Sequence, residues 1–262
     1  MRKLFFGGLL MLLAMPVLAM GQNPLEGTWK ADPSTIQYPT KPDVYLLKNG
    51  MYECTSCVPP IKIKADGTDQ KVSGHPYYDT LSVKAIDDHN VESTSMKDGK
   101  VVGTEKDSVS SDGETLTVNW SYSGNPSGGT QTGNYIAKRV TKGPAGANLI
   151  SGSWRTQKEE DPAAVLTWTY SLKGDELTMT NQTGQTYTAK LGGPDAPYKG
   201  DPGTTSVSVK MLGKDTLEET DKREGKIIGI GKMTVLADGN SAKIVFEDKL
   251  HGTTTKLEAK KQ

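Results

Sequence analysis

The sequence contains the same unit twice, and this repeat constrains the fold more than any other feature. A shift of 126 residues aligns Lys64–Trp120 with Lys190–Phe246 without a gap. The Gly-Thr-Trp-Lys stretch Gly27–Lys30 also resembles the Gly-Ser-Trp-Arg stretch Gly152–Arg155, with one residue gained or lost. Because each unit has about 110 to 120 residues, the size of a common single domain, the repeat predicts two domains.

The domain boundaries follow from the repeat and from local composition. We expect a first domain over residues 20–142, a linker over 143–150 that is rich in Gly, Pro and Ala, and a second domain over 151–262. In this arrangement each domain holds all of its own strands. Cleavage at Gly146 is then expected to release two halves that fold independently.

The first 19 residues have the pattern of a secretory signal peptide. Arg2 and Lys3 precede an almost wholly apolar stretch over 4–18, and small or short residues at Val17 and Ala19 fit a cleavage site. The stretch is shorter than the roughly 20 residues that cross a bilayer. We therefore expect a secreted or periplasmic protein with no stable membrane insertion after cleavage.

The composition favours short strands joined by turns. Hydrophobic residues make up 34% and aromatic residues 6% of the chain, which also has 29 Gly and 14 Pro. Strand patterns recur about every ten residues, separated by turns such as Asp98-Gly99 and Glu224-Gly225. The sequence therefore predicts an all-β protein with two tandem antiparallel meander β-barrels, each of about eight to nine strands.

The Gly-x-Trp on the first strand of each unit, followed by such a meander, resembles the calycin group, which includes lipocalins and fatty-acid-binding proteins. More closely, the chain is similar to secreted bacterial proteins with two lipocalin-like repeats. The resemblance implies that Trp29 and Trp154 each plug one end of a barrel, with a basic residue of the last strand across the indole ring. The candidates for that basic residue are Arg139 and Lys260.

Cys54 and Cys57 are the only two cysteines of the chain. Three functions are compatible with this spacing: a structural disulfide, a redox pair or half of a metal site. A catalytic pair usually begins a helix, whereas here a strand pattern precedes the pair and Pro59 and Pro60 follow it. A secreted protein favours the structural disulfide, and we predict no metal site and no cofactor.

Two equivalent Gly-x-Pro turns are candidates for the mouth of a barrel. The simplest interpretation of both is turn chemistry. The functional alternative is a ligand entrance lined by His75, Tyr77, Tyr78, Tyr198 and Asp201.

Charged residues also recur at equivalent strand positions. They usually lie on the solvated face and pair across strands, but inward orientation would make a polar lumen able to hold an acid. The residues concerned are Lys84, Glu92, Lys100 and Lys106, with Lys210, Glu218, Lys226 and Lys232 as their counterparts.

These features leave three functional hypotheses open. Equal numbers of basic and acidic residues, 31 each, give no field that would attract nucleic acid, and the sequence has none of the common nucleotide-binding or hydrolase motifs. The first hypothesis is a secreted non-enzymatic protein that carries a small apolar or amphipathic ligand in a barrel lumen. The second is a protein or cell-wall interaction module with solid barrels and an unknown partner. The third is an enzyme of unknown type.

Overall fold

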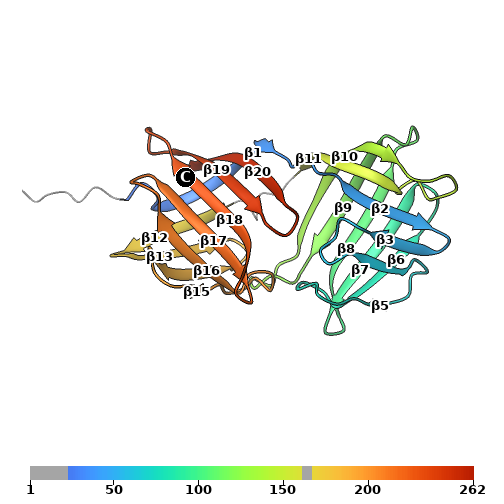
Figure 1. Cartoon of the computed structure of the whole chain (residues 1–262), viewed down its shortest axis with the longest axis horizontal. Helices are drawn as coiled ribbons and strands as arrows, with labels where there is room; N and C mark the ends of the chain where they lie inside the picture. Colours follow the sequence, from blue (N-terminus) through green and yellow to red (C-terminus); the bar gives the residue numbers. More distant parts are fainter. Residues whose placement is uncertain (1–22, 161–166) are drawn as a thin grey trace, which may run out of the picture.

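A computed structural model describes residues 23–160 and 167–262, and the predicted signal peptide lies outside the described residues. Within the described part, the strands form two antiparallel sheets of ten strands each, and each sheet curves into a nearly closed barrel (Figure 1). The all-β fold class with two barrels is therefore confirmed. Over the same residues, no helix is long and apolar enough to cross a membrane.

The first barrel is built from a continuous stretch of chain. Its sheet has the order β4-β3-β2-β11-β10-β9-β8-β7-β6-β5. The strands are β2 (Asp43–Lys48), β3 (Met51–Cys54), β4 (Ile61–Lys64), β5 (Gln70–Lys71), β6 (Thr80–Ala85), β7 (Asn90–Lys97), β8 (Lys100–Val109), β9 (Thr115–Tyr122), β10 (Gln131–Lys142) and β11 (Gly152–Glu160).

The second barrel combines the C-terminal half of the chain with the first strand. Its sheet has the order β14-β13-β12-β1-β20-β19-β18-β17-β16-β15. The strands are β1 (Gly27–Gln37), β12 (Thr167–Lys173), β13 (Glu176–Asn181), β14 (Thr186–Lys190), β15 (Ala196–Pro197), β16 (Ser206–Met211), β17 (Thr216–Arg223), β18 (Lys226–Val235), β19 (Ser241–Asp248) and β20 (Thr253–Lys261).

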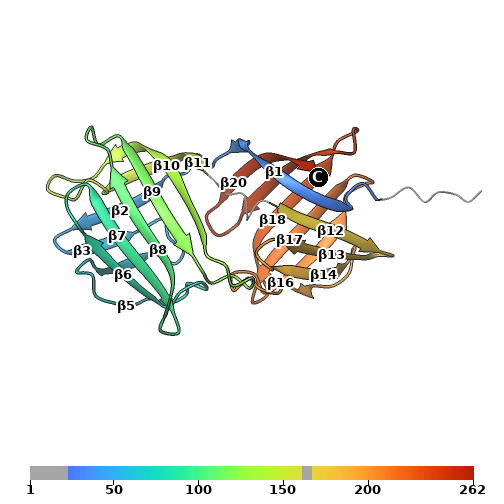
Figure 2. The same ribbon diagram turned by 180° about the vertical axis from the view of Figure 1, so that it is seen from behind.

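The predicted domain boundaries are wrong, because each repeat gives its first strand to the other barrel. Strand β1 pairs with β12 and β20, whereas β11 pairs with β10 and β2. Figures 1 and 2 show β1, in blue, among the yellow and red strands of the second barrel. Residues 143–150 are therefore not a linker between domains. They join two neighbouring strands of the first barrel, and Ile150 belongs to its core.

The sequence pattern could not assign the two exchanged strands because both carry the same Gly-x-Trp motif. Trp29 is fully buried in the core of the second barrel and Trp154 in that of the first, at 0% and 1% exposure. Each indole Nε1 donates a hydrogen bond to the carbonyl four residues earlier, Leu25 O at 2.8 Å and Ile150 O at 2.7 Å. Local sequence fixes this arrangement in each strand but does not determine which sheet the strand joins.

Alternation of apolar and polar residues places the two cores inside the barrels. In β6, Leu81 and Val83 are buried, and in β16, Val207 and Val209 are buried. Hairpin turns such as Asp98-Gly99 have positive φ at both residues, 51° and 74°, as tight turns between twisted strands require.

Candidate functional site

In each barrel a buried tryptophan lies against a cation from the neighbouring strand. The Arg139 guanidinium lies 3.9 Å from the centre of the Trp154 ring and donates to Ser151 O at 2.8 Å and Leu149 O at 2.6 Å. In the second barrel, Lys261 lies 4.9 Å from the Trp29 ring. The candidate Lys260 is therefore wrong by one position: it is exposed, because successive side chains of a strand point to opposite faces.

The first barrel encloses a cavity of about 470 Å³. This volume lies within the range of roughly 300–1,000 Å³ that is usual for small-molecule sites. Aliphatic side chains such as Ile61, Leu81 and Val83 cover part of its wall. Six tyrosines line the rest together with Trp120: Tyr45, Tyr52, Tyr77, Tyr78, Tyr122 and Tyr135.

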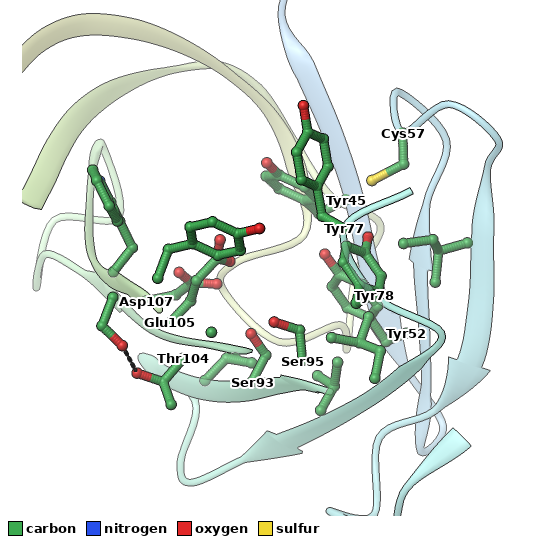
Figure 3. Close-up of a pocket in the computed structure, with 18 of the residues that line it drawn as sticks. Tyr45, Tyr52, Cys57, Tyr77, Tyr78, Ser93, Ser95, Thr104, Glu105 and Asp107 are labelled. Carbon is green, nitrogen blue, oxygen red and sulfur yellow. Dashed lines mark hydrogen bonds between the residues drawn. The ribbon is translucent and has the colours of Figure 1, made fainter. Parts of the chain in front are cut away.

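Two carboxylic acids on β8, Glu105 and Asp107, point into this cavity (Figure 3). Glu105 lies opposite Ser93 on one neighbouring strand and opposite Trp120 on the other. Asp107 lies two residues further along β8. Its Oδ1 atom is buried without a hydrogen-bond partner.

Both acids have a raised pKa, and none of the described residues places a counter-charge in the cavity wall. Glu105 faces the open lumen with its side chain exposed, and partial desolvation by the surrounding barrel raises its pKa. The same effect, strengthened by the nearby charge of Glu105, raises the pKa of Asp107 to about 8. Among the side chains that line this cavity, all in the described part of the chain, none is Lys, Arg or His. The first barrel is therefore an acidic, tyrosine-lined chamber.

The second barrel also holds two inward-facing acids, but on the neighbouring strand. Glu219 and Asp221 lie on β17, at the positions that Ser93 and Ser95 occupy in the first repeat. Tyr187 Oη donates a hydrogen bond of 2.6 Å to Glu219. Burial raises the pKa of Glu219 and of Asp221, and Asp221 Oδ1 has no hydrogen-bond partner among the described residues. The cavity here is smaller, about 260 Å³, and is lined mainly by apolar side chains.

The five residues predicted for a barrel mouth come together between the two barrels. They line one crevice of about 500 Å³: His75, Tyr77, Tyr78, Tyr198 and Asp201. Tyr77 Oη donates a hydrogen bond of 2.9 Å to Asp201 of the other barrel. His75 stacks on Tyr78 with ring centres 5.0 Å apart.

This crevice adjoins both lumens. Tyr77 and Tyr78 line the first cavity as well as the crevice, and Asp221 lines the second cavity as well as the crevice. The first cavity thus meets the crevice between the barrels at Tyr77 and Tyr78.

The remaining sequence candidates have structural positions. Cys54 and Cys57 form a disulfide, with an S–S distance of 2.08 Å. Most of the repeated strand charges lie outside the barrels, where Lys106 pairs with Glu92 and Lys210 pairs with Glu218. Lys232 is also among the residues that line the second cavity. In the described segments, no group of three or more His, Cys, Asp or Glu residues is placed to hold a metal ion.

The acids inside the barrels are the residues that sequence analysis missed. Their position along the strand could have revealed that they face the interior. Glu105 and Asp107 have the same parity along their strand as buried Gly103 and Val109, and Glu219 has the same parity as buried Leu217. The alternation that identifies the core face therefore assigns these acids to the interior.

Comparisons of the chain with models of protein families, with curated proteins and with solved structures gave no match.

Proposed function

We propose that this protein is a secreted, non-enzymatic binding protein that holds a small amphipathic molecule inside its first barrel. The observation that carries the proposal is the cavity of about 470 Å³, which meets the crevice between the barrels at Tyr77 and Tyr78. Its wall has aliphatic side chains on some strands and hydroxyl and carboxyl groups on others, which suits a ligand with both apolar and polar parts.

The cavity also favours this proposal over an interaction module with solid barrels. A solid barrel would need its central aromatic side chains to fill the lumen. In the first barrel, Trp120 lies at the wall instead, with its indole ring over Gly133. A Cβ atom added there would lie only 2.7 Å from that ring.

Native mass spectrometry of the mature protein, purified gently from its own host, tests the proposal. We expect a discrete added mass from a retained small molecule. The matched variants are Ser93→Trp, which fills the lumen, and Thr94→Trp, whose side chain points to the outer face of the same strand. The added mass should disappear in Ser93→Trp and persist in Thr94→Trp. Bare wild-type protein after incubation with extract of the host would refute the proposal.

A further inference from the structure

The first cavity contains two carboxyl groups, on Glu105 and Asp107, that no basic side chain of the described cavity wall pairs with. In the part of the chain that the structure describes, Asp107 Oδ1 is buried without a hydrogen-bond partner, and Glu105 faces the lumen with its side chain exposed. Among the described residues that line the cavity, no basic side chain is placed to pair with either acid. An unpaired acid enclosed by protein is costly, so such groups normally pair with a cation or take up a proton. On the outer face of the same strand, charge is balanced in the usual way, because Lys106 forms an ion pair with Glu92.

The second barrel shows that this fold can satisfy such an acid internally. There, Glu219 accepts a hydrogen bond from Tyr187 on β14. In the first repeat, the residue equivalent to Tyr187 is Ile61, which has no donor. The acids of the first barrel are therefore left available to a partner from outside.

The aromatic wall around these acids is suited to a positive charge. Tyrosine and tryptophan faces attract cations electrostatically, and the attraction grows when water is excluded. Tyr45 and Tyr52 stack at 6.3 Å on one side of the cavity, and Tyr77 meets Tyr122 edge-on at 6.2 Å near the crevice between the barrels. Figure 3 shows the labelled tyrosines around the same space into which Glu105 and Asp107 point.

We propose that the ligand of the first barrel is an organic cation, an amine with an apolar body, whose ammonium group binds Glu105 and Asp107 within the tyrosine wall. This inference rests on the proposed function, because it names the class of ligand for the same cavity. Two acids without a counter-ion disfavour an anionic ligand, such as a fatty acid, in this barrel.

Three probes of nearly equal size and different charge test the inference in the full-length mature protein by isothermal titration calorimetry. They are phenethylamine, which is cationic, 2-phenylethanol, which is neutral, and 3-phenylpropionate, which is anionic. We expect the amine to bind at least about tenfold more tightly than the alcohol, as one charge-assisted hydrogen bond provides, and the acid to bind most weakly.

Two neutral double variants locate the effect. Glu105→Gln/Asp107→Asn should reduce the affinity for the amine to about that for the alcohol and leave the affinity for the alcohol within about twofold. Glu219→Gln/Asp221→Asn, the matched control in the second barrel, should keep the preference for the amine. Because all substitutions are neutral and nearly isosteric, near-ultraviolet circular dichroism is expected to match that of the wild type.

The outcomes separate this inference from the proposed function. If the alcohol or the acid binds wild-type protein as tightly as the amine does, the cation inference is wrong while the binding function stands. The inference is equally wrong if the amine preference persists in Glu105→Gln/Asp107→Asn, or if no probe binds. The proposed function falls only if, in addition, no ligand is retained in native mass spectrometry.

Discussion

The exchange of first strands predicts which fragment of the chain folds alone. The first barrel comprises β2 to β11, so residues 38–160 contain its complete sheet. Residues 38–142 end where the sequence pattern places the end of the first domain, and they lack β11. Both fragments omit β1, because its tryptophan motif resembles that of β11 and could occupy the vacant position.

The magnitude follows from the side chains that the shorter fragment loses. Ile150 and Trp154 are each 1% exposed in the core of the first barrel. Truncating a buried isoleucine costs about 2–5 kcal/mol and a buried tryptophan about 3–5 kcal/mol, which gives about 5–10 kcal/mol together. Strand β10 also loses its pairing with β11 from Asn134 to Lys142. Since domains are stable by only about 5–15 kcal/mol, the shorter fragment should be unfolded.

Urea unfolding followed by far-ultraviolet circular dichroism provides the assay, with dispersion of amide proton signals in NMR spectra as a second measurement. We expect a single cooperative transition for residues 38–160 and a sloping, non-cooperative curve for residues 38–142. A cooperative transition in the shorter fragment, or none in the longer one, would show that the first barrel does not depend on β11.

Two further predictions concern the barrel ends and the buried acids. Arg139→Met should lower the free energy of unfolding by about 2–4 kcal/mol, because it removes the cation over Trp154 and three charge-assisted hydrogen bonds to backbone carbonyls, whereas Lys261→Met should cost only about 1 kcal/mol. Urea titration compares the two, and equal losses would contradict the role assigned to the Arg139 contacts. Asp107 has a raised pKa of about 8 against an ordinary 3.8, so the folded state binds more protons than the unfolded chain between these values. The stability should therefore fall as pH rises from about 4 to 8. Urea titrations across this range should show a shallower fall for Asp107→Asn, and an unchanged slope would rule out this residue as a source of the pH dependence.

The local structure of the fold was predictable from the sequence, whereas the assignment of strands to barrels was not. Alternation and turn residues predict strands and hairpins because both depend on neighbouring residues. The choice between β1 and β11 depends on contacts more than 100 residues apart, such as Trp29 opposite Trp168. Because β1 and β11 carry the same motif, the sequence pattern does not show which of them makes these contacts.

The candidate site divides in the same way. The mouth residues His75, Tyr77, Tyr78, Tyr198 and Asp201 were predicted as one group from equivalent turns, and the structure brings them into one crevice. These residues also join the two barrels, through the hydrogen bond from Tyr77 to Asp201. This contact depends on how the barrels are placed relative to each other, and no pattern of neighbouring residues predicts it. The acids within the lumens have a local signal in their parity.

A comparison of the two lumens shows what has been retained as the repeats diverged. In the first barrel Glu105 lies directly opposite Ser93 on the neighbouring strand, and in the second Glu219 lies opposite Gly231 at the equivalent pair. Common descent alone would keep the acid on the same strand of each repeat. Instead, the first barrel has the acid on β8 and the small residue on β7, whereas the second has the acid on β17 and the small residue on β18, the equivalents of β7 and β8. One long side chain and one small one fit at this level of the lumen, so the exchange keeps both the space and the carboxyl group. This compensation supports a role for an acid at that depth of the lumen.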